Sequence, residues 1–211
     1  LWMDRDVDMD PYYGTGMEEF GVADELAERN KLFGCADLNI TTSMGHDQNT
    51  VNVTTEVTFP YDVTDANYAV EYIVTADGLT DASWGQTNYF ADGSMGYPKY
   101  MDVFANGEST VFGLVFNDVA VLTSEQMGGS ENAVTSATAD TPVKLKYSFN
   151  LSDAVNTSGN PIIQNVDNVK VVALLIDRET GIVVNANKCK LGASTGIVNV
   201  KGSQDANAAI L

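Results

Sequence analysis

The sequence contains few of the residues that carry hydrolytic, metal or redox chemistry. Its 211 residues include two cysteines and one histidine, His46, which lies in an apparent turn. A single histidine excludes histidine-rich zinc sites, and no G-x-S-x-G elbow accompanies any serine. Cys35 and Cys189 lack CxxC spacing, which excludes a zinc knuckle and a dithiol redox motif. We therefore expect a protein without a cofactor and without enzymatic activity.

Basic residues are also scarce. Lys plus Arg number 11 against 29 for Asp plus Glu, which gives a formal charge of -18. This charge repels phosphate backbones and anionic lipids, so no nucleic-acid partner is expected. The abundant carboxylates keep one enzymatic alternative open, a carboxylate-based hydrolase, because the separation of a catalytic pair is a three-dimensional quantity.

Long apolar runs are absent. The best is VVALLI at 171–176, which is much shorter than a membrane-spanning helix requires. We expect no transmembrane span. A chain that begins at Leu1 is typical of a trimmed or partly observed product, so any lipid anchor would precede that residue.

The two cysteines leave two interpretations open. Cys35 precedes the first predicted strand and Cys189 lies in the last strong one, so a disulfide could join them in an oxidising compartment. The alternative is a pair of buried free thiols, because cysteine is among the most buried residue types.

The opening stretch DRDVDMDP places a carboxylate at every second position. Asp4, Asp6 and Asp8 match the start of a calcium-binding loop, but Met9 stands where that loop needs glycine and Thr15 where it needs glutamate. These acids are therefore weak metal candidates, and a looser site would need Glu18 or Glu19. We expect instead a solvated acidic connector in which Arg5 and water offset the repulsion. Asp10-Pro11 would make the turn into a helix.

Hydrophobic periodicity predicts a mainly β protein with one short N-terminal helix. Met17, Phe20, Ala23, Leu26 and Ala27 follow helical spacing. From Ala36 the period becomes two, and turn signals separate the segments, which is typical of an antiparallel β-sandwich of immunoglobulin-like or jelly-roll type. We expect a connector and helix at 1–34, a sandwich domain at 35–192, and an edge strand with a tail at 193–211. Strands are predicted near 36–43, 50–59, 67–76, 143–151, 168–177 and 181–190.

Two further segments carry weaker signals. VFGLVFNDVAVL, at 111–122, is ambiguous between strand and helix, and GGSENAVTSATADT, at 128–141, predicts a flexible loop. In the clearest strand, alternation predicts one inward and one outward set. The inward set is Val51, Val53, Thr55, Val57 and Phe59, and the outward set is Asn52, Thr54, Glu56 and Thr58.

A long excursion at 81–109 mixes turn residues with aromatics. Aromatic faces beside side-chain amides suit a neutral glycan or a peptide, and the overall negative charge disfavours anionic ligands. The alternative is that the aromatics pack the excursion onto the sandwich. The candidate ligand-binding residues are Trp84, Gln86, Asn88, Tyr97 and Tyr100.

Four pieces of sequence resemble the Omp-twenty-eight family of outer-membrane proteins and lipoproteins from Bacteroidetes. They are YAVEYIVTADGLT, WGQTNYF, FNDVAV and VVALLIDRETGIVVNANKCKL, and the similarity runs from about residue 37 to 191. The resemblance implies an envelope location and a C-terminal β-sandwich, often preceded by a thioredoxin-like part whose last strand would be LWMDR. The CxxC of that part is missing, so no redox activity follows.

These observations together predict a non-enzymatic protein of the cell envelope, at the outer-membrane surface or in the periplasm. Its role would be binding, adhesive or structural. The expected partner is a neutral glycan, a peptide or another envelope protein. The more specific alternative is a glycan- or peptide-binding lipoprotein module that uses the aromatic loop at 84–104.

Overall fold

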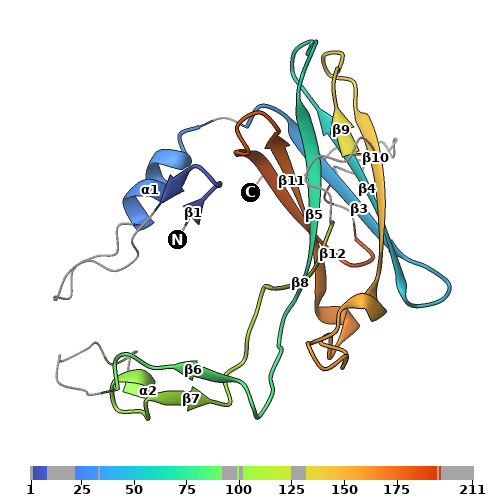
Figure 1. Cartoon of the computed structure of the whole chain (residues 1–211). Helices are drawn as coiled ribbons and strands as arrows, with labels where there is room; N and C mark the ends of the chain where they lie inside the picture. The colour runs from blue at the N-terminus through green and yellow to red at the C-terminus, as the bar shows by residue number, and fades with distance from the viewer. Residues whose placement is uncertain are drawn as a thin grey trace, which may run out of the picture.

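Two antiparallel sheets pack face to face and form the sandwich (Figure 1). The computed structural model describes residues 2–8, 22–32, 34–91, 99, 102–124, 132–193 and 195. The first sheet has the strand order β10-β4-β3 and the second has the order β12-β11-β5-β8, with β9 also paired to β5. Their strands are β3 (Asp37–Met44), β4 (Thr50–Thr58), β5 (Tyr68–Ala76), β8 (Val119–Thr123), β9 (Ala133–Val134), β10 (Val143–Asn150), β11 (Val169–Asp177) and β12 (Val183–Lys190).

Smaller elements lie outside the two main sheets. The N-terminal strands β1 (Trp2–Met3) and β2 (Val7–Asp8) form a hairpin, and helix α1 spans Val22–Arg29. The segment between β5 and β8 contains β6 (Gly85–Thr87), β7 (Thr110–Phe112) and the short helix α2 (Asp102–Ala105). Two 3-10 turns, Leu151–Asp153 and Val166–Asn168, join the late strands.

The fold class and all six predicted strands are confirmed, with boundaries shifted by one or two residues. The ambiguous run at 111–122 resolves into parts of β7 and β8 with extended chain between them. The loop prediction for 128–141 is wrong in part, because β9 pairs with β5 through Tyr68↔Val134 and Ala69↔Ala133. The predicted helix is present as α1, while its first positions, 17–21, lie outside the described residues.

The predicted register of β4 is confirmed. Its inward set, from Val51 to Phe59, is at most 1% exposed at every position. The outward set shares a face with Ser43 and Thr41 of β3 and with Lys144 and Lys146 of β10, so the outer face of the first sheet is polar throughout. Side chains that alternate in polarity thus fix which face of this sheet meets the second sheet.

Aromatic contacts cross the space between the sheets. Tyr72 of β5 stacks on Tyr147 of β10 with ring centroids 5.4 Å apart, and Tyr147 meets Phe149 edge to face at 4.9 Å. Leucine, isoleucine and valine side chains from both sheets complete a single core. Such rings bury large apolar areas and prefer these offset or perpendicular arrangements, so they fix how the sheets face each other.

Asparagine side chains close one side of the sandwich, where β12 meets β3. The Nδ2 atoms of Asn185 and Asn187 donate to the carbonyls of Ala36 and Leu38, the second at 2.6 Å. Each Oδ1 accepts the next N–H of β12, from Ala186 and Lys188, both at 2.8 Å. Each amide therefore satisfies one main-chain group on each edge.

Further groups of the β3 edge bond to the last residue of β12 and to residues that follow it. The Thr42 N–H donates to the Ala193 carbonyl at 2.9 Å, and the Thr42 hydroxyl donates to the Lys190 carbonyl at 2.8 Å. Thr195 receives the Ile40 N–H on its hydroxyl at 2.8 Å and donates its own N–H to the Ile40 carbonyl at 2.9 Å. The edge strand predicted within 193–211 is not assigned at 193 or 195, although both residues hydrogen-bond to β3, and its other residues lie outside the described part.

The two cysteines are unbonded, so the disulfide interpretation is not realised. Cys35 lies beside Asn185 in one pocket, whereas Cys189 faces the core four residues further along β12. Four residues of extended strand span roughly 13 Å, which exceeds the reach of a disulfide. Burial raises the pKa of both thiols, so both are protonated at neutral pH.

Asp4, Asp6 and Asp8 lie in a hairpin rather than in the open connector that we expected, and Asp10-Pro11 lies outside the described residues. Residues 2–8 form a hairpin whose turn residues Asp4 and Arg5 have positive φ, 54° and 59°. The carboxylate of Asp6 pairs with Arg29 at the end of α1, and the Nε of Arg29 lies 3.9 Å from Asp4. Arg5 instead reaches Glu71 of β5 at 2.8 Å. Arg29, which is distant in sequence, therefore offsets much of the electrostatic repulsion between the N-terminal carboxylates.

Replacing Asn187 with alanine should weaken the closure between β3 and β12. The change leaves the Leu38 carbonyl and the Lys188 N–H without their side-chain partner, so we expect a loss of about 1–3 kcal/mol in the free energy of unfolding. Denaturant unfolding measures it. The control is Asn52→Ala on the polar outer face of β4, which should stay within about 0.5 kcal/mol. Equal losses in both variants would show that the bridge contributes nothing specific.

Asp47 in the β3–β4 turn should make stability depend on pH. Its carboxylate accepts the Thr50 hydroxyl at 2.6 Å and the N–H groups of Thr50 and Asn49, which lowers its pKa to about 2. Because the folded pKa is depressed, this stabilisation is present above the ordinary value near 4 and is lost as pH falls toward 2. The difference in melting temperature between wild type and Asp47→Asn should therefore shrink over that range. Asp65→Asn, at an exposed turn, is the control; a constant difference would contradict the assignment.

Candidate functional site

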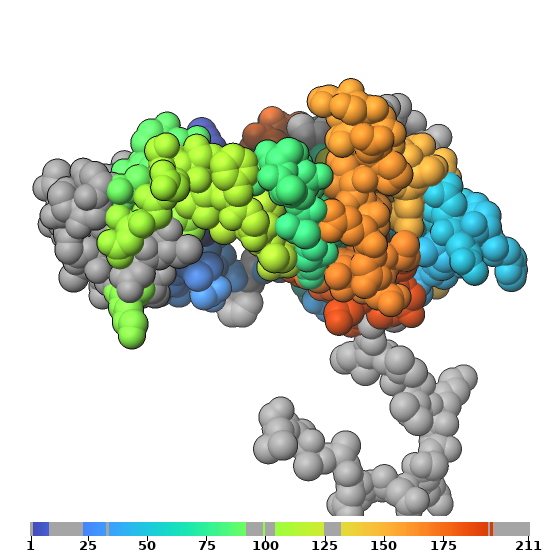
Figure 2. Space-filling view, turned by 90° about the horizontal axis from the view of Figure 1, so that it is seen from below, coloured from blue at the N-terminus to red at the C-terminus, as the bar shows by residue number. Residues whose placement is uncertain are grey.

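The candidate site lies on an arm, residues 77–118, that projects from the second sheet between β5 and β8 (Figure 1). The arm continues the β5–β8 pairing as one antiparallel ribbon. Ala76 faces Val119, a bridge joins Leu79 to Phe116, and Gly85 faces Phe112. Beyond the base, the ribbon stands clear of the sandwich (Figure 2).

Charged groups fix the base of the arm to the neighbouring strands. Asp77 pairs with Lys170 of β11, and Asp118 lies 3.2 Å from Lys170 and 3.1 Å from Lys188 of β12. The lysines, together with an N–H from the opposite strand in the case of Asp77, lower the pKa of both aspartates. The stabilisation that they provide is thus present above pH 4 and lost in acid.

A loop between β10 and β11 also holds the arm, at Thr80, further from the sheet than Asp77. The Gln164 amide donates to the Thr80 carbonyl at 2.6 Å and accepts the Thr80 N–H at 3.3 Å. Trp84 packs at the same level, edge to face on Phe116 with centroids 5.8 Å apart. These contacts attach the base of the arm to the sandwich, whereas β6 pairs only with β7 among the described strands.

Asn88 organises the tip of the arm, residues 85–112. Its Nδ2 donates to the carbonyls of Phe104 and Glu108 at 2.6 and 2.9 Å, and its Oδ1 accepts the Phe90 N–H at 3.1 Å. The residue is 5% exposed. Both amide donors are therefore used inside the tip, and Asn88 supports the shape of the tip rather than presenting a free amide.

Apolar side chains are exposed along the arm. Tyr89 is 91% exposed, Val115 61% and Phe112 58%. Phe112 lies across Gly85, where an added Cβ would come within 2.8 Å of the ring, so the glycine leaves room for the aromatic face. This cross-strand arrangement presents Phe112 at the surface of the ribbon.

The structure brings only part of the predicted ligand-binding set to one surface. Gln86 is exposed on β6, Trp84 is half-buried against Phe116, and Asn88 is internal. Tyr97 and Tyr100 lie outside the described residues. The candidate residues named from the sequence included neither Phe112 nor Val115. Their segment, VFGLV, places large apolar residues among strong turn signals. Apolar residues in a predicted turn region could have indicated an exposed apolar surface.

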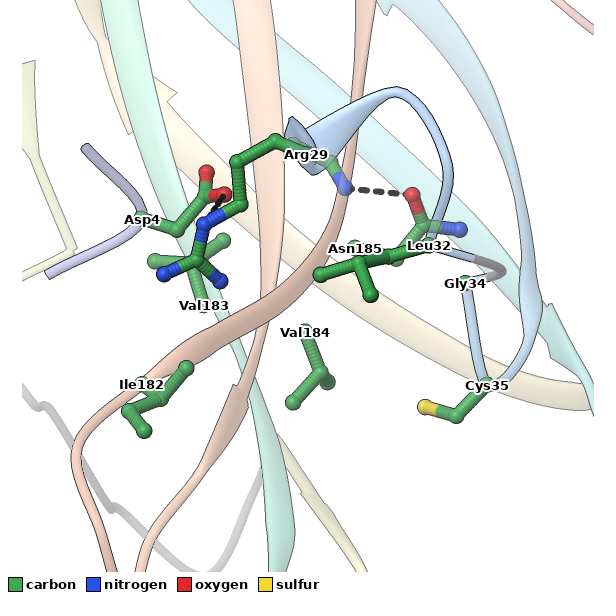
Figure 3. A pocket seen from close by; sticks show the side chains of 10 residues that line it. Asp4, Arg29, Leu32, Gly34, Cys35, Ile182, Val183, Val184 and Asn185 are labelled. Atoms are coloured by element: carbon green, nitrogen blue, oxygen red, sulfur yellow. Dashed lines mark hydrogen bonds and ion pairs between the residues drawn. The ribbon is translucent and has the colours of Figure 1, made fainter. Parts of the chain in front are cut away.

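A second concave feature lies between the N-terminal unit (β1, β2 and α1) and β12 (Figure 3). It is a pocket of about 540 Å³. Asp4 and Arg29 line one end, Cys35 and Gly34 the other, and Leu32 with residues 182–186 forms the walls. Val184 is the extra residue of a bulge in the β11–β12 pairing, so the edge of β12 is irregular where it meets the pocket.

Metal chemistry has no assembled site in the described ranges. No group of three or more His, Cys, Asp or Glu side chains converges there, and Asp8 is held in the β1–β2 pair opposite Trp2. His46 is exposed in the β3–β4 turn, as predicted. Across the described part of the chain, no helix has both the length and the apolar character of a membrane span.

No protein-family model matches the chain, and no curated protein matches it in sequence. Among solved structures, HBP35 of Porphyromonas gingivalis matches with a TM-score of 0.51 and 12% identity, over 90% of this chain and 48% of that one. The chain thus spans about half of that protein. A domain of the outer membrane lipoprotein Omp28, also from Porphyromonas gingivalis, matches at a TM-score of 0.37 and 12% identity, over 76% and 91% of the two chains. The first similarity shows a shared β-rich fold.

Asn88→Ala should loosen the tip of the arm without unfolding the sandwich. The change removes hydrogen bonds to three main-chain groups, whereas the core lies entirely elsewhere. Amide hydrogen exchange at 85–90 and 102–112 should rise at least tenfold, with little change in melting temperature. The control is Gln86→Ala, an exposed neighbouring amide. Unchanged exchange in Asn88→Ala would show that Asn88 does not hold the tip.

Proposed function

We propose that the chain is a non-enzymatic binding module of a cell-envelope protein, and that the arm is its contact surface. The observation that carries the proposal is the exposure of Tyr89, Phe112 and Val115 on a ribbon that projects beyond the sandwich. Exposed apolar side chains grouped on one element are typical of interaction sites, because their burial by a partner is favourable.

The construction of the arm supports the same proposal. A two-stranded ribbon alone is marginally stable in water. Here the base is held by Lys170 and Gln164, while β6 pairs only with β7 among the described strands. A partner that covers the ribbon would add apolar burial where the sandwich supplies none.

The favoured ligand is a neutral glycan or a peptide. Tyr89 and Phe112 offer aromatic faces, and the exposed Gln86 offers an amide that can orient a polar ligand. The charge of -18 disfavours anionic ligands. A carboxylate-based hydrolase is less favoured, because Asp77 and Asp118 converge on Lys170 and anchor the arm.

The envelope location and the lipoprotein alternative rest on the motifs that resemble the Omp-twenty-eight family, such as WGQTNYF and the long final pair of strands. An adhesive or structural role would use the same exposed arm toward another envelope protein. Fractionation of cells that express the natural protein tests the location directly.

Binding should depend on the aromatic residues of the arm. In a screen of neutral glycans and peptides, a ligand of the wild type should bind Tyr89→Ala and Phe112→Ala at least about tenfold more weakly, because each change removes a stacking face. Trp84→Ala tests the base of the arm in the same screen. The control is Tyr61→Ala, which alters an exposed aromatic residue near the start of β5, at the opposite end of that strand from the arm. Equal affinity in all four variants would place the site elsewhere.

A further inference from the structure

We propose that the pocket between the N-terminal unit and β12 binds a small amphipathic cation, an aliphatic body that carries an ammonium group. The site is separate from the arm and uses residues that the proposed function does not involve. Its volume of about 540 Å³ falls within the range of small-molecule sites in proteins.

The walls of the pocket suit an aliphatic body. Leu32, at 64% exposure, lines the pocket together with the apolar side chains of Ile182, Val184 and Ala186. Cys35 adds a thiol that burial keeps protonated, so this end of the pocket is also uncharged. An alkyl chain inserted here would shield side chains that are now in contact with water.

The opposite end of the pocket carries excess negative charge. The Arg29 guanidinium is committed to Asp6, and its Nε lies 3.9 Å from Asp4, too far for a hydrogen bond. The Asp4 side chain is 42% exposed, and its carboxylate accepts no hydrogen bond from any residue in the described ranges. Two carboxylates and one guanidinium leave one net negative charge at this end of the pocket.

This arrangement favours an ammonium group over other head groups. An ammonium ion near Asp4 would gain a charge-assisted hydrogen bond without displacing Arg29 from Asp6. A carboxylate would be repelled by Asp4 and Asp6, and a hydroxyl would gain only a neutral hydrogen bond. The field of an acidic chain also attracts cations to the opening.

The test uses three probes with the same six-carbon chain: n-hexylammonium, hexan-1-ol and hexanoate. Binding to the full chain is followed by nuclear magnetic resonance titration at neutral pH and 0.15 M salt. We expect saturable binding of n-hexylammonium with a Kd on the order of 1 mM, which is typical of so small a ligand. Hexan-1-ol should bind at least fivefold more weakly, and hexanoate should not bind measurably.

Two variants locate the site. Asp4→Asn should weaken n-hexylammonium binding about fivefold or more while it leaves hexan-1-ol unaffected. Ala186→Phe fills the pocket from an exposed position on β12 and should abolish binding of both probes. The matched control, Asp153→Asn, removes the same charge from an exposed turn far from the pocket and should leave the affinity unchanged.

Three results would overturn the proposal. They are absence of saturation by n-hexylammonium in the wild type, equal weakening by Asp4→Asn and Asp153→Asn, and persistence of binding in Ala186→Phe. The second result would show a general attraction of cations to an acidic protein. Melting temperatures of the variants confirm that each is folded, and chemical shifts at 182–186 report the site in every titration.

Discussion

The sandwich depends on the hydrogen-bonded closure between β3 and β12, because these two strands end the two sheets on the same side. An open edge exposes a row of N–H and C=O groups that can pair with another chain. Here Asn185 and Asn187 span the gap with side-chain amides, so the edges are joined where main-chain pairing between the sheets does not reach. Gly34 leaves room for this, since a Cβ there would lie 2.9 Å from the Asn185 amide nitrogen.

The closure between β3 and β12 also explains where the pocket and the arm lie. On the closed side, the N-terminal unit reaches the start of β12 through Asp4, whose carbonyl accepts the Val183 N–H at 2.9 Å. On the other side of the second sheet, β5 and β8 run past the core and become the arm. A stable sandwich thus carries two less buried additions, each attached by a few polar contacts.

The β framework was predictable from sequence because alternation over eight or nine residues is a local signal. Val51 to Phe59 show it clearly, and their burial follows the pattern. The partner of the opening acids was not predictable, since Arg29 is more than twenty positions from Asp4 and only the fold brings them together. Asn88 shows another limit: composition marks an amide beside aromatics, but whether the amide faces a ligand or its own backbone depends on tertiary contacts.

The role of the two asparagines in the closure could have been recognised from a pattern in the sequence. In VVNANKCK, positions 185 and 187 point to the same face as Cys189, which is buried, so two polar residues occupy inward positions of a strand. Polar residues placed there need hydrogen-bond partners inside the fold. That pattern indicates a buried polar role, although it cannot name the strand that supplies the carbonyls.

The bonds to Ala193 and Thr195 have a consequence for synthesis of the chain. Ile40 of β3 is synthesised 155 residues before Thr195, one of the residues that complete the outer edge of the strand. Until then a nascent chain carries a strand with unsatisfied main-chain groups on one side, even after β4 has paired with the other. Such an intermediate is prone to pair with its neighbours on a polysome, so a chaperone that holds extended chains would benefit its production.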